Sequence, residues 1–487
     1  MSAGIIIVGL GPGNPDQITL EAWRTLEAAS EVYLRTARHP TVASLPQGPA
    51  YPSFDEVYES GVTFAEVYER IAQRVIELGQ RPEGVVYAVP GHPLAGETTV
   101  MRILALAQEA KLPVRIIAGI SFIEPVTIAL GIDPFDGLQI CDAMLLAQRH
   151  HPALDPDVAA LIVQVYDRQV AADCKLALMN LYPDDHPVRL VRSAGTPEQT
   201  LRDIPLYELD RQRDLDHLTS AYLPPLAHKG SLSSFQDLVA RLRAPGGCPW
   251  DRKQTHASLR SSLLEETYEV LDALDADDAE SLQEELGDLL LQIVLHAQIA
   301  AESGEFKMID ATTHILDKLV RRHPHVFGNT QVNGSDEVLR NWEQIKREER
   351  GQRGEEAVSM LAGVSRALPA LSRAMELQKR AARVGFDWPA VEPVAAKVDE
   401  ELAEFRQAED AENRAAELGD LFFSLVNLAR WLGIDPESAL RETNQRFERR
   451  FGTMERRAHE AGTVLEKMNL DEMDALWEQA KREEQEP

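Results

Sequence analysis

The first stretch of the chain alternates short runs of β-branched residues with segments of helical periodicity. Ile5–Val8, Val85–Val89 and Val114–Ile117 predict strands, whereas Glu21–Ala29 and Thr98–Ala110 predict helices. Strands that alternate with helices are typical of a mainly parallel sheet covered by helices. We therefore expect an α/β lobe at the start of the chain.

The same alternation continues less regularly from residue 119 to about residue 208. Ala159–Tyr166, Lys175–Leu181 and Val188–Arg192 are strand candidates, and Thr196–Thr200 is a candidate helix start. This pattern favours a second α/β lobe, so that the amino-terminal part is two-lobed.

The pattern changes after two short segments that resemble a linker, Tyr222–Leu226 and His228–Leu232. The first contains two adjacent prolines, which neither a helix interior nor a central strand accepts. After Ser233 nearly the whole sequence has helical periodicity. The sequence thus predicts an α/β plus all-α protein, with the boundary between the two classes near residues 222–232.

The helical part contains an internal repeat. Trp342–Glu349 and Trp477–Glu484 share the pattern Trp-Glu-Gln-x-Lys-Arg-Glu-Glu at an offset of 135 residues. A group of acids precedes each copy at nearly the same offset: Glu265, Glu266, Glu269, Glu285 and Asp288 in the first copy, and Glu400, Glu401, Glu404, Glu417 and Asp420 in the second. A repeat of this kind predicts a duplicated module.

The repeated acids lie in apolar helices. Asp288 and Asp420 are each followed by a run of leucine, phenylalanine or other apolar residues, where an unpaired carboxylate is costly. Converging carboxylates also repel one another, and a divalent cation removes both penalties. Ligands that are all oxygens favour Mg²⁺ or Mn²⁺. A solvated acidic face and a structural ion-pair network are the alternatives.

Basic residues and a tryptophan follow the acids in each copy. The basic residues are Lys318, Arg321 and Arg322 in the first copy, and Arg446, Arg449 and Arg450 in the second. Lys346 and Lys481 lie four residues after Trp342 and Trp477. A tryptophan ring stacks on nucleobases, and cations bind phosphates. Alternatively, both tryptophans pack in the helical core.

Composition restricts the range of functions. The 487 residues carry a formal net charge of −29, which argues against stable nucleic-acid binding, because no broad basic surface is available. Cys141, Cys174 and Cys248 are far apart and suggest neither a disulfide framework nor a zinc site, as expected in the cytoplasm. The apolar run at the amino terminus is too short for a signal or membrane span.

Two glycine-containing turns follow predicted strands in the first lobe. Residues 9–13 place glycines at positions 9, 11 and 13, which does not satisfy the dinucleotide fingerprint, because position 14 is Asn. Val89–Pro93 forms a second turn. Loops at the carboxyl ends of parallel strands form the usual ligand crevice, although a tight turn without a ligand is the simpler interpretation.

The helical part resembles the MazG family of tandem all-α nucleoside triphosphate pyrophosphohydrolases. The resemblance covers residues 232–487 and includes Arg241–His256, both acidic patterns and Val320–Phe327. It also includes the two repeated segments Trp342–Glu349 and Trp477–Glu484, which we call the tryptophan boxes. It implies hydrolysis of a nucleoside triphosphate to a monophosphate and pyrophosphate. It implies metal ligands at Glu266, Glu269, Glu285 and Asp288, and at Glu401, Glu404, Glu417 and Asp420. Candidate catalytic residues are Glu265, Glu400, Lys318, Arg322, Arg446 and Arg450; candidate substrate-binding residues are Trp342, Lys346, Trp477 and Lys481.

The first part resembles the tetrapyrrole methylase family over roughly residues 4–220. The resemblance rests on residues 5–13, Asn14–Leu20, the turn Val89–Pro93 and Ala118–Phe122. It implies that S-adenosylmethionine binds near Gly9, Gly11, Gly13, Pro90, Gly91, His92 and Ser121. The family commonly has Gly-Asp-Pro where this chain has Gly91-His92-Pro93. The fusion of the two parts resembles the YabN type of protein.

These observations predict a tetrapyrrole methylase-like domain over 1–222 and two MazG-like helical bundle domains over 232–355 and 360–487. The favoured function is a Mg²⁺-dependent pyrophosphohydrolase. One alternative is an S-adenosylmethionine-dependent methyltransferase whose helical half is a dimerising or regulatory module, and another is a non-catalytic nucleotide sensor. The apolar helices have more surface than one hairpin buries, so either the two copies pack on each other or a second chain covers them. A homodimer is the favoured expectation. We expect no membrane association, because the apolar run at the amino terminus is too short to span a membrane.

Overall fold

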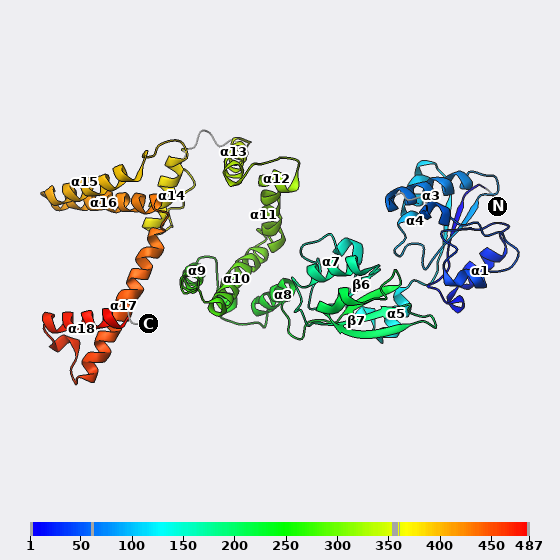
Figure 1. Cartoon of the computed structure of the whole chain (residues 1–487), viewed down its shortest axis with the longest axis horizontal. Helices are drawn as coiled ribbons and strands as arrows, with labels where there is room; N and C mark the ends of the chain where they lie inside the picture. Colours follow the sequence, from blue (N-terminus) through cyan, green and yellow to red (C-terminus); the bar gives the residue numbers. More distant parts are fainter. Residues whose placement is uncertain (1–2, 60–62, 353–358, 360, 485–487) are drawn as a thin grey trace. The chain divides into compact units, whose positions relative to one another are not determined.

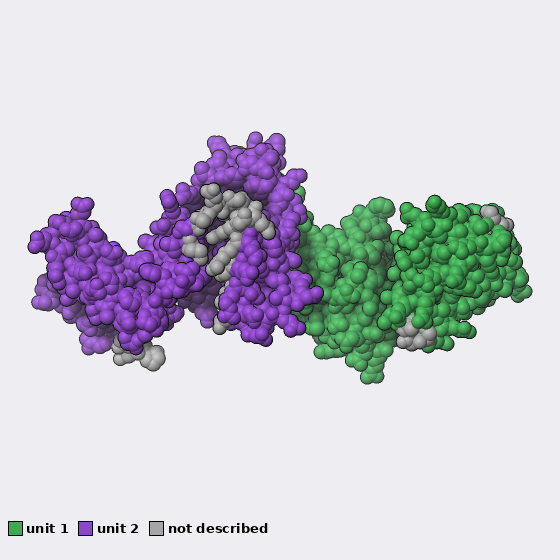
Figure 2. Space-filling view, turned by 90° about the horizontal axis from the view of Figure 1, so that it is seen from above, with its two compact units in different colours: residues 1–241 green, residues 242–487 purple. Residues whose placement is uncertain are grey.

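The computed structural model describes residues 3–59, 63–352, 359 and 361–484, and it divides into two compact units. The first unit is Met1–Arg241 and the second is Leu242–Pro487 (Figures 1 and 2). The first has α/β structure and the second is helical, which confirms the predicted fold class. The predicted border between the two helical copies, residues 355–360, falls almost entirely outside the described residues, so the division into two helical domains stays a prediction.

The first lobe is a four-stranded parallel sheet in the order β2-β3-β1-β4. In the register of the sheet, Ile5 lies between Val85 and Val114. The strands are β1 (Ile5–Gly9), β2 (Tyr33–Leu34), β3 (Val85–Val89) and β4 (Val114–Ile117), and the helices are α1 (Leu20–Glu27), α2 (Asp55–Glu59), α3 (Phe64–Gly79) and α4 (Thr98–Glu109). Every residue of β3 is buried, as expected for a central strand covered on both faces.

The second lobe is a mixed five-stranded sheet in the order β5-β6-β9-β7-β8. Only β5 and β6 are parallel, and the other neighbours are antiparallel. The strands are β5 (Leu138–Asp142), β6 (Ala159–Val163), β7 (Pro187–Arg192), β8 (Thr200–Pro205) and β9 (Thr219–Leu223), and the helices are α5 (Ile123–Leu130), α6 (Ala143–Leu146) and α7 (Arg168–Leu178).

Three predictions for this lobe are wrong. Residues 175–178 continue α7 rather than forming a strand, because Cys174, Ala177 and Leu178 recur at helical spacing and are all buried. Thr196–Thr200 is a turn that leads into β8, and the Thr196 hydroxyl donates to the Ser193 carbonyl. Tyr222 belongs to β9 and pairs with Leu161, so the linker begins only after Leu223.

The second unit consists of helices, and its first helix, α8, spans the division between the units. The helices are α8 (Leu232–Arg243), α9 (Arg260–Asp275), α10 (Ala279–Glu302), α11 (Met308–Arg322), α12 (Pro324–Phe327), α13 (Ser335–Gln352), α14 (Ala370–Ala382), α15 (Val391–Gln407), α16 (Ala411–Trp431), α17 (Pro436–Glu460) and α18 (Leu470–Glu483). Helices α9 and α10 form one hairpin, and α15 and α16 form another (Figure 1). Asp278 and Asp410 cap α10 and α16, which fixes where each second helix begins. No described helix is long and apolar enough to cross a membrane.

The helical unit leaves many large apolar side chains exposed. Those on the two hairpins are Leu264, Tyr268, Leu274, Leu286, Leu290 and Ile293, and Leu418, Phe422, Phe423 and Leu425. Contiguous apolar patches on helices mark a surface that another element or partner covers.

Candidate active site: two acidic helix hairpins

The first hairpin brings three carboxylates together. Glu266 on α9 and Glu285 and Asp288 on α10 each offer an oxygen, and these oxygens lie within 4.8 Å of one another. Glu285 and Asp288 are three residues apart, so they share the face of α10 that meets α9. All donors are carboxylate oxygens, the set that suits Mg²⁺ or Mn²⁺.

Burial and neighbouring carboxylates both oppose the ionisation of Glu266 and Glu285. Burial raises the pKa of Glu266, and a hydrogen bond with Glu269 and the charge of Asp288 raise it further. Burial also raises the pKa of Glu285, as does the neighbouring Glu269. Glu269 therefore lies beside the three-oxygen group although it does not belong to it. Repulsion of this kind is what a bound cation relieves.

An amide is the neutral partner of the first cluster. The Gln292 side-chain amide donates to Glu266 Oε1 at 3.5 Å, and Gln292 Oε1 is buried with no hydrogen-bond partner. A buried polar atom without a partner is rare, and it fits a site that is completed by a bound group.

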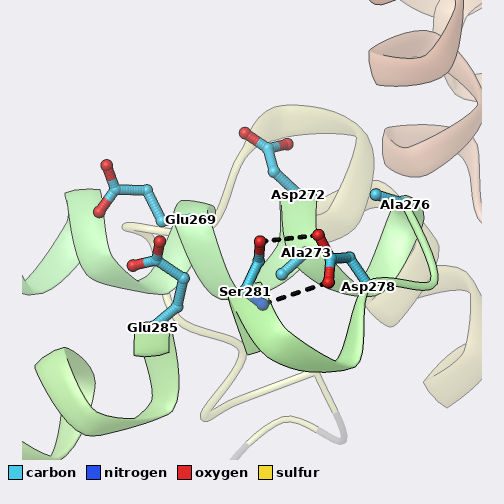
Figure 3. Close-up of a pocket in the computed structure, with 7 residues that line it drawn as sticks. All are labelled: Glu269, Asp272, Ala273, Ala276, Asp278, Ser281 and Glu285. Atoms are coloured by element: carbon cyan, nitrogen blue, oxygen red, sulfur yellow. Dashed lines mark hydrogen bonds between the residues drawn. The ribbon is translucent and has the colours of Figure 1, made fainter. Parts of the chain in front are cut away.

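A pocket of about 250 Å³ opens at the end of this hairpin. Figure 3 shows Glu269 and Glu285 close together on its wall, with Asp278 bonded to Ser281 on the other side. The pocket is lined by Glu269, Asp272, Ala273, Ala276, Asp278, Ser281 and Glu285. The acidic cluster thus borders a cavity rather than a flat surface.

The second hairpin repeats the arrangement. Glu401 on α15 and Glu417 and Asp420 on α16 each offer an oxygen within 4.8 Å of the others. Burial raises the pKa of Glu404 and the charge of Glu401 adds to the effect, while Lys397 opposes it. The repeat seen in the sequence is therefore a repeat of geometry, and each copy gathers three of the four acids expected as ligands.

Glu265 and Glu400, expected as catalytic residues, stand outside the three-oxygen groups. Glu265 is exposed on α9, and Glu400 forms an ion pair with Lys397 at 2.8 Å. Lys397 is a residue that the repeat alone does not reveal, because the first copy has Ser262 at the equivalent position.

The expected cations and tryptophans form a second duplicated feature. In the first copy, Arg322 pairs with Glu349 at 2.5 Å and lies over the Trp342 ring. In the second copy, Arg450 likewise pairs with Glu484 at 2.7 Å and lies over the Trp477 ring. These contacts bind each tryptophan box to the preceding basic helix. Both arginines are therefore already paired with a glutamate of the same copy.

The remaining candidates have local contacts. Lys346 lies over the Trp342 ring at 4.9 Å from the centroid, and Lys481 pairs with Glu478 at 2.6 Å. Arg446 donates to the Thr443 hydroxyl at 2.9 Å, and Lys318 is half-buried on α11. Trp477 packs beside a small core of Met454, Ala458 and Leu465, as the core-packing alternative expects.

In the first unit, three turns meet at the carboxyl end of the parallel sheet. Gly11 and Gly91 exchange backbone hydrogen bonds of 3.2 and 2.7 Å. A Cβ on Gly9 would lie 2.6 Å from the Gly91 oxygen, and one on Gly119 would lie 2.2 Å from it. Only glycine permits this approach of one backbone to another. The sequence therefore places backbone groups, rather than side chains, at this edge.

The other expected cofactor residues lie around these turns. Ser121 donates to Glu124 at 2.5 Å, and His92 Nδ1 accepts from the Leu94 backbone at 3.1 Å. Gly13 has a φ of 130° and lies against Thr196 and Pro40. Pro90 lies in the turn that contains Gly91.

A buried ion pair that no sequence motif indicates lies near the same edge. Arg35 lies directly after β2 and pairs with Glu97, which precedes α4. The Arg35 Nε also donates a hydrogen bond to the Tyr58 hydroxyl at 2.9 Å. Glu97 is only 6% exposed, and burial raises its pKa to about 7. Arg35 and Glu97 are 62 residues apart, and no pattern in the sequence connects them.

Together, the two units define an α/β methylase-like domain fused to all-α pyrophosphohydrolase-like domains. The family model of tetrapyrrole (corrin/porphyrin) methylases matches residues 4–210, and the model of the MazG nucleotide pyrophosphohydrolase domain matches residues 254–327. Residues 368–447, which contain the second hairpin, match the model of phosphoribosyl-ATP pyrophosphohydrolase.

The chain belongs to the family of fusion proteins that includes YabN of Bacillus subtilis. It is 43% identical to that protein over 498 residues, which cover 99% of each chain. The helical half is also 48% identical over 253 residues to the nucleoside triphosphate pyrophosphohydrolase of Escherichia coli K12, covering 51% of this chain and 95% of that protein. It is 45% identical over 250 residues to the MazG pyrophosphohydrolase/pyrophosphatase of Thermotoga maritima, with the same coverage.

Proposed function

We propose that the helical unit hydrolyses nucleoside triphosphates to nucleoside monophosphates and pyrophosphate. The observation that carries the proposal is the pair of three-carboxylate groups, which occupy equivalent positions on two helix hairpins. The similarity to pyrophosphohydrolases over the same residues supports it.

The acids of each hairpin fit a divalent cation, because three carboxylate oxygens converge within 4.8 Å of one another. Glu266, Glu285 and Asp288 would hold Mg²⁺ or Mn²⁺ in the first copy together with Glu269, and Glu401, Glu417, Asp420 and Glu404 would do so in the second. When bound, such an ion would act as a Lewis acid, which favours the ionisation of water and offsets the negative charge of a triphosphate.

The chain's own residues position the reactants. In the reaction, a water oxygen forms a bond to phosphorus, the bond to the leaving pyrophosphate breaks, and the water loses its proton. Glu265 and Glu400 directly precede the ligand acids Glu266 and Glu401 in the sequence and are the proposed acceptors of that proton. Lys318, Arg322, Arg446 and Arg450 are the proposed phosphate contacts, and Trp342, Lys346, Trp477 and Lys481 are the proposed contacts to the rest of the nucleotide.

Paired substitutions test the assignment. Asp288→Asn together with Asp420→Asn should abolish pyrophosphate release, while the helical content by circular dichroism stays unchanged. Glu348→Gln plus Glu466→Gln is a matched control, because both glutamates are exposed and lie outside the acidic clusters. Pyrophosphate release by the double aspartate variant at the wild-type rate would refute the site.

A second activity is supported by the glycine turns of the first unit. We propose that S-adenosylmethionine or its demethylated product binds at Gly9–Gly13, Pro90–His92 and Ser121, because three loops converge at the carboxyl edge of the sheet. Titration calorimetry of the full chain with S-adenosylhomocysteine tests this, and absence of heat at millimolar ligand would leave this unit as a scaffold.

The assembly and location are proposed on separate grounds. The exposed apolar residues of the two hairpins support a homodimer in which a second copy covers them. The three cysteines are all free, which supports a reducing cytoplasmic setting. The high acidic charge supports the absence of stable nucleic-acid binding.

A further inference from the structure

The two acidic hairpins differ in what holds their inner glutamate. In the first, Glu266 is half-buried and accepts a hydrogen bond from the neutral amide of Gln292. In the second, Glu401 is only 6% exposed, and Lys397 Nζ lies 2.9 Å from its Oε1. The same ammonium lies 2.8 Å from Glu400 Oε1, so it joins two of the repeated acids.

The sequences of the two copies explain this difference. Lys397 is four residues before Glu401, and Ser262 is four residues before Glu266. Conversely, the position of Gln292, four residues after Asp288, holds Ser424 in the second copy, four residues after Asp420. One copy therefore stabilises its glutamate with a neutral amide and the other with a cation.

The charge balance of the clusters differs accordingly. Among the residues that the structure describes, no lysine, arginine or histidine nitrogen lies within 4.0 Å of a carboxylate of Glu266, Glu269, Glu285 or Asp288, as the ion pairs show. In the second copy, Lys397 already neutralises part of the negative charge and fills space beside Glu401.

We propose that Lys397 makes the two divalent-cation sites unequal, so that the first copy binds the free cation more tightly than the second. The inference rests on the proposed function, because it takes both clusters as cation sites. A unit charge about 5 Å from a divalent ion changes its affinity by roughly tenfold even at the dielectric constant of water, and by more in a partly buried site. Lys397 is therefore a residue that sets metal affinity, and it does so in one copy alone.

The test measures binding of Mn²⁺ alone to the full chain, by calorimetry and by the electron paramagnetic resonance signal of the unbound ion. Wild-type protein should show two classes of site that differ by about tenfold or more. Asp288→Asn should remove the tight class, and Asp420→Asn should remove the weak class, which assigns each class to a hairpin.

Charge swaps then test the lysine itself. Lys397→Met, which keeps the length of the side chain, should tighten the weak class by about tenfold, whereas Lys397→Arg should leave it weak. Ser262→Lys should weaken the tight class by a similar factor. Lys467→Met, at an exposed lysine outside the cluster, should change neither class.

The outcomes separate the two proposals. Two classes of site that do not respond to Lys397→Met, or equal affinities in wild-type protein, would overturn this inference while leaving the cation sites in place. Absence of Mn²⁺ binding from folded wild-type protein would overturn the proposed function itself, and this inference with it. Circular dichroism of every variant establishes that the helices are intact.

Discussion

Removing the carboxylate of Glu349 should locally destabilise the tryptophan box of the first copy. Glu349 accepts hydrogen bonds from both Arg321 and Arg322, and its side chain is 12% exposed. The Arg322 side chain is 15% exposed and also lies over Trp342. The substitution Glu349→Gln removes the charge while keeping the size of the side chain.

The size of the effect follows from the pKa of this carboxyl group. The hydrogen bond and charge of Arg322, with those of Arg321, lower the pKa of Glu349 from 4.5 to about 2. A shift of this size corresponds to an upper limit of about 3 kcal/mol in favour of the folded carboxylate. Because Arg321 is half-exposed and screened by solvent, we expect a loss of about 2 kcal/mol.

Hydrogen exchange measured by mass spectrometry suits this prediction, because it reports local opening in a chain with more than one unit. A loss of about 2 kcal/mol should lower the protection of backbone amides in α13 by roughly 30-fold at pH 7. Glu348→Gln is the matched control, since Glu348 is exposed and bonds only to Gln344 among the contacts of the described residues.

The dependence on pH gives a second readout. Because folding lowers the pKa of Glu349, its stabilisation is fully present above about pH 4.5 and is lost as the pH falls to about 2. The difference between wild type and Glu349→Gln should therefore be constant between pH 5 and pH 7. Equal protection of α13 in the two proteins at pH 7 would refute the reasoning.

Three further predictions concern the first unit and the assembly. Gly119→Ala should destabilise the first unit by about 3 kcal/mol, because the new Cβ would meet the Gly91 oxygen. Gly230→Ala is the control and should leave the melting temperature unchanged, because a Cβ there has open space. Arg35→Ala should cost about 3 kcal/mol at pH 7 and less at pH 5, where Glu97 takes up a proton, and a loss independent of pH would contradict the buried pair. Light scattering should give twice the 54.2 kDa of one chain; a mass of one chain would exclude the homodimer.

The sequence predicts those features that repeat or that follow strong local rules. The nearly equal offsets of Glu266 and Glu401, and of Asp288 and Asp420, predict a duplicated acidic module, and in the structure each copy gathers three of its acids on a helix hairpin. The glycines at positions 9, 11 and 91 predicted tight turns after strands, and these turns pair with one another. Both signals depend on residue types whose physical role is nearly independent of context.

Other features depend on tertiary partners that a single sequence does not reveal. The run Lys175–Leu181 is apolar enough for a strand, but the buried face of α7 decides in favour of a helix up to Leu178. The pairing of Arg322 with Glu349, 27 residues away, is likewise a contact that the sequence pattern does not indicate. The repeat does not indicate a role for Lys397, because this lysine is present in only one of the two copies, and Ser262 occupies its position in the other.

We propose that this chain cleaves nucleoside triphosphates between the nucleotide and pyrophosphate by means of divalent cations. The most direct test incubates the purified full-length protein with each common nucleoside triphosphate and Mg²⁺, and measures pyrophosphate, orthophosphate and nucleoside monophosphate together. The proposed reaction releases equal amounts of pyrophosphate and monophosphate, and none after chelation of the metal. Release of orthophosphate with the diphosphate as the other product, or equal turnover in the presence of the chelator, would contradict it.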